Sequence, residues 1–178
     1  MLLVCEGETE VEYLTGLRRR GQIVDVRKAS KRDAMGIVRE AITRGSGDYT
    51  HIWAVFDSDN RDVSDASTVA RKASTERQII NTAVSQPSFE VWLLLHFSED
   101  VRGCHTPGDA RRLLQKAAPN WDKGQWTRTK RKGTRFTDFE HGVKAACERA
   151  ERLGPVTPGG GPATDVWRIF RSDEFRLV

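Results

Sequence analysis

The chain has 178 residues, of which 38% are hydrophobic and 30% are charged, a balance typical of one globular domain. Its longest uninterrupted apolar runs, such as Val91 to Leu95, are too short to cross a bilayer, so we expect no membrane anchor. The formal net charge of +4 is too small to indicate a polyanionic partner by itself.

The first residues and the cysteines bear on the cellular compartment. Leu2 to Cys5 is typical of a strand and not of the longer apolar core of a signal peptide. Cys5, Cys104 and Cys147 are odd in number and far apart, so they indicate neither a disulfide framework nor a paired metal motif. These features predict a cytoplasmic location.

Apolar and β-branched runs alternate with helical patterns in the first half of the chain. The runs predict strands at residues 2–5, 22–26, 51–56 and 78–84. Helices are predicted between them, at residues 9–20, 33–44 and 64–77, the first with Thr9 as its cap and Glu12 completing a capping box. This alternation predicts an α/β fold with a mostly parallel central sheet flanked by helices.

The second half of the chain carries helical signals and no further strand signal. Helices are predicted at residues 88–97, with Ser88 as the cap, and at 107–118, 137–153 and 164–170. Residues 154–165 form a Gly/Pro-rich stretch that we expect to be a loop. We therefore predict one domain, residues 1–178, made of an α/β core (1–98) and a helical C-terminal extension (99–178).

Acidic residues follow two of the predicted strands. Glu6 follows the first strand, and Asp57 and Asp59 follow the third. In an open parallel sheet, ligands bind beyond the carboxyl ends of the strands, and an extended backbone would place Asp57 and Asp59 on the same side. Clustered carboxylates repel one another unless a cation bridges them, so a Mg²⁺ or Mn²⁺ site is the simplest explanation.

Each of these acids also has a structural explanation. An aspartate after a strand is often a turn former or a helix cap. Glu8 and Glu12 lie in the first turn of a predicted helix, where the helix dipole stabilises acidic side chains. We interpret them as solvated or capping residues. The four histidines have no ligand spacing and are interpreted as packing or surface residues.

One more glutamate is a site candidate, because it lies in an apolar helical pattern. Glu90 occurs in "SQPSFEVWLLLHF", a helix expected to be buried over much of its circumference. A buried carboxylate must be paired, bound to a metal or directed into a crevice.

A basic segment with aromatic residues runs from Trp121 to Phe136. It contains no acid from residue 123 to 135 and is expected to bind phosphates and to stack an unpaired base. A solvated surface loop is the alternative. Its candidate nucleic-acid contacts are Lys123, Trp126, Arg128, Lys130, Arg131, Lys132 and Arg135.

The stretches "LLVCEGETE", "WAVFDSD", "SQPSFEVWLLLHF" and "GPATDVWRIF" together resemble the RloB-like proteins, a branch of the Toprim superfamily associated with restriction and phage-defence loci. The resemblance extends from Leu2 to about Phe170 and implies a Toprim-like Rossmannoid domain. The chain departs from the family pattern at Gln86, where Asn is expected.

The resemblance also implies residue roles. Toprim domains hold a divalent metal with a Glu after the first strand and a DxD motif after a later one, which match Glu6, Asp57 and Asp59. In the related overcoming-lysogenisation nucleases two further glutamates complete a two-metal site, and their matching positions are Glu10 and Glu90. Lys123 is a candidate for stabilising charge in the transition state.

The favoured function is a metal-dependent nuclease, with Mg²⁺ or Mn²⁺ as cofactor, that cuts DNA or RNA in defence against phage. The chain has no ATP-binding motif, so the ABC- or AAA-type ATPase often paired with this family would be a separate protein. One alternative is a non-catalytic nucleic-acid or partner-binding module with a structural cation site, and another is a phosphohydrolase of small esters. The oligomeric state stays open, a homo-oligomer included.

Overall fold

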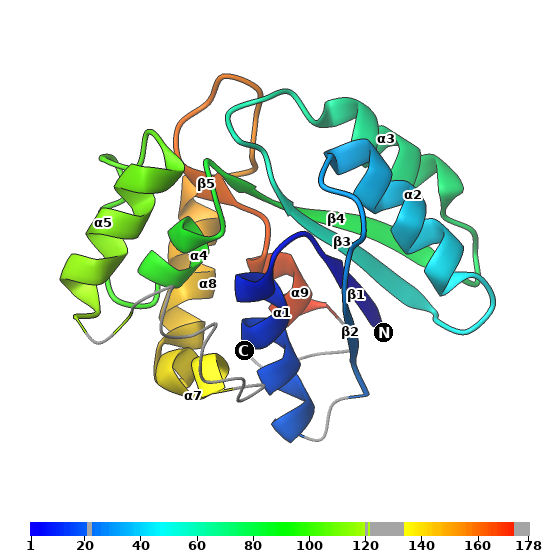
Figure 1. Ribbon diagram of the computed structural model, residues 1–178, viewed down its shortest axis with the longest axis horizontal. Helices are drawn as coiled ribbons and strands as arrows, with labels where there is room; N and C mark the ends of the chain where they lie inside the picture. Colours follow the sequence, from blue (N-terminus) through cyan, green and yellow to red (C-terminus); the bar gives the residue numbers. More distant parts are fainter. Residues whose placement is uncertain (21–22, 120, 122–133, 173–178) are drawn as a thin grey trace.

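The computed structural model of the protein describes residues 1–20, 23–119, 121 and 134–172. In this part of the chain five strands form one sheet in the order β2-β1-β3-β4-β5. The first four pair in parallel and β5 pairs antiparallel to β4. The predicted α/β fold with a mostly parallel sheet is confirmed (Figure 1). The strands are β1 (Leu2–Cys5), β2 (Asp25–Lys28), β3 (His51–Asp57), β4 (Ile79–Gln86) and β5 (Ala163–Thr164).

Helices cover both faces of the sheet (Figure 1). One face packs against α2 (Ala34–Gly45) and α3 (Ser64–Ala73), and β1 contributes Leu2 and Val4 to that core. Leu3 and Cys5 point to the other face, since successive strand residues alternate, and they pack in a second core. The helices of this second face are α1 (Glu8–Thr15), α4 (Glu90–Leu94), α5 (Pro107–Ala117), α7 (Thr134–Phe139), α8 (Val143–Leu153) and α9 (Trp167–Arg171).

The helical C-terminal part of the chain shares a core with the α/β part. Buried residues of α8 and α9, such as Cys147 and Phe170, belong to the same cluster as Leu3 of β1 and Tyr13 of α1. Two 3₁₀ helices, Gly16–Arg20 and Glu140–Gly142, extend α1 and connect α7 to α8. No described helix is long and apolar enough to cross a lipid bilayer.

Helix starts test the predicted caps. Asp33, the first residue of the helix predicted over 33–44, is the cap of α2 and accepts a hydrogen bond of 2.8 Å from the backbone N–H of Gly36. The predicted capping box of Thr9 and Glu12 is wrong, because α1 begins at Glu8 after Gly7 and has no side-chain cap. Ser88 does not cap α4 either: its backbone carbonyl, and not its hydroxyl, accepts a hydrogen bond from the N–H of Val91.

Two strands differ from their prediction. The second strand was expected over residues 22–26, but β2 begins at Asp25 and continues to Lys28 at the edge of the sheet. Ile23, the apolar residue that suggested the earlier start, is 92% exposed. The stretch 154–165, expected to be a loop throughout, contributes β5, which adds Ala163 and Thr164 to the other edge.

Candidate functional site

The candidate site lies at the point where the chain reverses its direction along the sheet. β1 is flanked by β2 on one side and β3 on the other, so the connections after β1 and β2 proceed to opposite edges. In open parallel sheets such a switch point, at the carboxyl ends of the strands, is the usual ligand site. Glu6 directly follows β1 and Asp57 is the last residue of β3, so both lie there.

Two hydrogen bonds fix Glu6 against Asp57. The backbone N–H of Glu6 donates to the carbonyl of Val55 at 2.9 Å, which extends the pairing of β1 and β3 by one residue. The backbone N–H of Asp57 donates to Oε2 of Glu6 at 3.0 Å. The Glu6 carboxylate is therefore held at the end of β3.

The Asp57 carboxyl group is the electrostatic centre of the site. Its Oδ1 atom is enclosed and has no hydrogen-bond partner among the described residues. Burial raises the pKa of Asp57 well above its ordinary value, because a charge without solvent is disfavoured, and neighbouring carboxylates raise it further. These neighbours are, in order of decreasing effect, Glu10, Glu90, Glu6 and Asp59. The other four acids proposed from the sequence thus all lie close enough to Asp57 to raise its pKa.

Two of these glutamates are enclosed by protein. Glu10, in the first turn of α1, is 5% exposed, and Glu90, the first residue of α4, is 2% exposed. Glycine at position 7 leaves room for Glu10, because a Cβ atom there would lie 2.7 Å from its Oε2. Glu8, by contrast, is exposed and pairs with Lys28 at 2.6 Å, as expected for a surface acid.

Asp59 is placed differently from the sequence expectation. The extended backbone that would align it with Asp57 ends at Asp57, and Asp59 and Asn60 have positive φ values of 48° and 60°. The N–H of Arg61 donates to the carbonyl of Ser58 at 2.8 Å and closes a tight turn of the type that requires two such residues. Asp59 is exposed on this turn and acts on Asp57 from the solvent side.

The chemistry of the donor atoms suits a hard divalent cation, but their arrangement is not a closed coordination shell. Carboxylate oxygens are the ligands that Mg²⁺ and Mn²⁺ prefer, and the enclosed Oδ1 of Asp57 lacks a hydrogen bond. Among the described residues, however, no group of three or more His, Cys, Asp and Glu side chains is placed so that it could hold a metal ion. A bound cation would require these side chains to move together.

Most of the predicted nucleic-acid contacts lie outside the described residues. This holds for Lys123, Trp126, Arg128 and the Lys130–Lys132 cluster, and the side chain of Arg135 is likewise not described. The aromatic residues at the two ends of the segment are described, and they are core residues: Trp121 is 3% and Phe136 is 2% exposed. Neither of these two rings is available to stack a base, and stacking by Trp126, which lies outside the described residues, stays a prediction.

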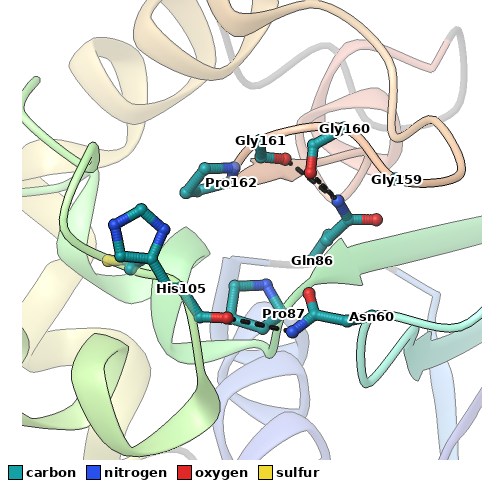
Figure 2. A pocket seen from close by; sticks show the side chains of 9 residues that line it. Asn60, Gln86, Pro87, His105, Gly159, Gly160, Gly161 and Pro162 are labelled. Atoms are coloured by element: carbon teal, nitrogen blue, oxygen red, sulfur yellow. Dashed lines mark hydrogen bonds between the residues drawn. The ribbon is translucent and has the colours of Figure 1, made fainter.

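The structure adds polar residues that the sequence argument did not select. Gln86, at the end of β4, donates from Nε2 to the carbonyls of Gly160 and Gly161, and its Oε1 accepts a long bond of 3.4 Å from Ser58. Asn60 donates to the backbone carbonyl of His105 at 2.9 Å (Figure 2). The sequence signal that could have selected them is their position: Gln86 ends β4, and Asn60 lies shortly after the end of β3. Gly160 and His105 come close only through the tertiary fold.

The fold and the site together define a class of protein: an α/β protein with a cluster of carboxylates at the switch point of its parallel sheet. The model of the RloB-like protein family matches residues 1–171, nearly the whole chain, and the chain belongs to this family. The recognition made from the sequence motifs is thereby confirmed. Comparison with curated proteins and with solved structures gives no match.

Proposed function

We propose that this protein is a divalent-metal-dependent nuclease of the Toprim type, acting on phosphodiester bonds of DNA or RNA. The observation that carries the proposal is the convergence of four carboxylates at the switch point on the carboxyl group of Asp57, whose Oδ1 atom is enclosed. Such a concentration of negative charge costs stability unless a cation compensates it. Strongly perturbed carboxylates in a sheet-end crevice are also typical of functional sites.

The residues have distinct roles in this proposal. Glu6, Asp57 and Asp59 hold a Mg²⁺ or Mn²⁺ ion, and Glu10 and Glu90 hold a second one. When bound, the metal ions neutralise phosphate charge and lower the pKa of an attacking water. Glu6 is oriented by its hydrogen bond with the backbone of Asp57, so the chain itself fixes one ligand before metal binds.

The remaining parts of the proposal rest on the sequence. The basic residues of the 121–136 segment, Lys123 among them, would contact the phosphates of the nucleic acid. A separate ATPase of the ABC or AAA kind would act with the nuclease in defence against phage, since the chain has no ATP-binding motif of its own. A cytoplasmic location would follow from such a role.

A non-catalytic module is the second candidate. The observation that favours it is that the described carboxylates do not form a metal-holding group of three as they stand. In that case the acidic cluster would bind at most a structural cation, and binding of nucleic acid or of a protein partner would be the function.

A cleavage assay with matched variants separates the two candidates. Plasmid, single-stranded DNA and tRNA are incubated with the protein in Mg²⁺, Mn²⁺ or EDTA, alone and with the ATPase encoded beside it, if one is present. We expect metal-dependent cleavage that Glu10→Gln abolishes and Glu8→Gln preserves, since both residues start α1 but only Glu10 is enclosed. Absence of cleavage under all these conditions would favour the binding module, and equal loss of cleavage in both variants would contradict the role assigned to Glu10.

A further inference from the structure

A cavity of about 260 Å³ lies beside the acidic cluster, at the carboxyl end of β4. Its lining comes from four separate segments: the turn after β3, the end of β4, the loop before α5 and the loop before β5. The lining residues used below are Asn60, Gln86, Pro87, His105 and Pro162, together with glycines 159–161. Asn60 belongs to the same turn as Asp59, and Gln86 follows Ser85, the pairing partner of Asp57.

The cavity has apolar walls and polar ends. In Figure 2 the rings of Pro162 and Pro87 lie on opposite sides of the space, with the imidazole of His105 at one end and the carboxamides of Asn60 and Gln86 at the other. The two proline rings bound a slot, with the imidazole at one end, that suits a planar ring. A ligand in this slot would contact apolar faces and meet hydrogen-bonding groups at its edges.

The polar end of the cavity is held in place by the protein. The Nε2 of Gln86 is occupied by the carbonyls of Gly160 and Gly161, which fixes the glycine loop to the end of β4. The Nδ2 of Asn60 donates to the carbonyl of His105, and no described group donates to its Oδ1. Asn60 therefore presents an oriented acceptor to a donor on a ligand.

The charge of the lining selects the ligand class. No carboxylate, ammonium or guanidinium group lines this cavity, so it offers no counter-charge for a phosphate. An uncharged heterocycle with polar edges fits this lining. The volume lies just below the range for drug-sized ligand pockets, about 300–1,000 Å³, and suits a single ring system better than a whole nucleotide.

We propose that this cavity binds a nucleobase, that of the nucleotide adjoining the phosphate held at the acidic cluster. The placement relative to the phosphate rests on the proposed nuclease function, whereas binding of the base itself does not require cleavage. His105 and Pro162 contact the base through their rings, and the Oδ1 of Asn60 accepts a hydrogen bond from its edge. This contact gives the site a preference for one base at the cleavage position.

Nuclear magnetic resonance of the metal-free protein tests base binding without cleavage. Uncharged nucleosides (adenosine, guanosine, cytidine and uridine) are titrated up to their solubility limits while the histidine ring signals are recorded. We expect a saturable shift of the His105 signals with at least one nucleoside and none for His51, which lies at the opposite end of β3. Ribose and inorganic phosphate serve as probes and should leave His105 unchanged.

A variant tests the role of Asn60. Asn60→Gly removes the carboxamide and tolerates the positive φ of this position, so the turn is preserved, and the affinity for the preferred nucleoside should fall roughly tenfold. Asn81→Ser, in the other half of β4, should bind as wild type. Failure of every nucleoside to shift His105, equal shifts with ribose or phosphate, or unchanged affinity in Asn60→Gly would overturn the proposal. Since no metal or cleavage is involved, these results are independent of the nuclease test.

Discussion

The backbone N–H of Asp57 and the side chain of Glu6 are joined by a hydrogen bond of 3.0 Å across the switch point of the sheet. This bond connects the end of β3 to the residue after β1, fifty-one positions away in the chain. One carboxylate oxygen of Glu6 thus has a structural role in addition to the metal-binding role that we propose for the residue.

Two substitutions of Glu6 separate these roles. Gln keeps an oxygen that can accept the N–H of Asp57 but carries no charge, so Glu6→Gln should lose cleavage by about 10²-fold or more while the melting temperature stays near that of wild type. Glu6→Ala should also lower the free energy of unfolding by about 1–3 kcal/mol, because the N–H is left without its acceptor. Nucleic-acid binding, measured by fluorescence anisotropy, should survive in both. Wild-type cleavage by Glu6→Gln at limiting metal would contradict the assigned role.

Asp57 should make the metal-free protein less stable as the pH rises. Its folded pKa is raised above the value of about 3.9 for the unfolded chain, so the unfolded state loses this proton first. The stabilising contribution is complete below about pH 4 and is lost as the pH rises through the folded pKa. Melting curves of Asp57→Asn in EDTA should therefore match wild type in acid and lie above it at pH 7. A variant that melts below wild type at pH 7 would show that the carboxylate is not strained.

Gly7→Ala is expected to disturb the site more than the fold. The added Cβ would meet Oε2 of Glu10 at 2.7 Å, and this atom is the end of a flexible side chain that can turn away. The unfolding free energy should change by less than about 1 kcal/mol, since the φ of −115° at Gly7 is ordinary for alanine. Metal affinity and cleavage should fall together. Unchanged metal affinity, measured by calorimetry, would mean that metal binding does not depend on the position of the Glu10 carboxylate.

The second core contains a buried histidine with the opposite pH dependence to Asp57. Nε2 of His96 and the hydroxyl of Tyr13 are 2.9 Å apart, and burial lowers the pKa of His96 from 6.5 to about 3. The unfolded chain takes up a proton first on acidification, so this contribution to stability is present above pH 6.5 and is lost as the pH falls toward 3.

Replacing both members of this pair should flatten the acid side of the stability profile. The double variant Tyr13→Phe, His96→Phe has no group to titrate there. Its loss of unfolding free energy per pH unit should therefore be smaller than that of wild type by up to about 1.4 kcal/mol. Tyr13→Phe alone should lower the unfolding free energy by about 1–3 kcal/mol, because a buried ring nitrogen loses its partner. Denaturant titrations from pH 7 to 4 measure both. An equally steep profile in the double variant would assign the acid sensitivity to other groups.

The strands that could be predicted from the sequence are the buried ones, because burial on both faces requires a continuous run of apolar residues. β1 and β3 are enclosed on both faces, and their continuous apolar runs ended in the sequence close to where the strands end. β2 is an edge strand in which Val26 alone is buried, and its charged residues resemble a loop. β5 has two residues and is held by pairing with β4, a long-range contact that no local sequence pattern predicts.

The acidic site was predictable in composition and not in geometry. Glu6 and Asp57 follow from the rule that ligands bind at strand ends, and the burial of Glu90 follows from its apolar helical neighbours. The tight turn at Asp59 was missed, although Asp and Asn are the non-glycine residues that adopt positive φ most readily. The prolines and glycines around the nearby cavity converge from distant segments, so only the tertiary structure groups them.

The central claim is that Asp57 and the four carboxylates around it form a divalent cation site, and calorimetric titration of the metal-free protein with Mn²⁺ tests it most directly. We predict saturable binding by wild type and by Glu8→Gln, with loss of binding in Asp57→Asn and a marked decrease in Glu10→Gln. The same cation at a hundredfold excess over its dissociation constant should stabilise wild type by about 2.7 kcal/mol. Wild-type protein that binds no Mn²⁺, or an Asp57→Asn variant that binds as tightly as wild type, would contradict the account.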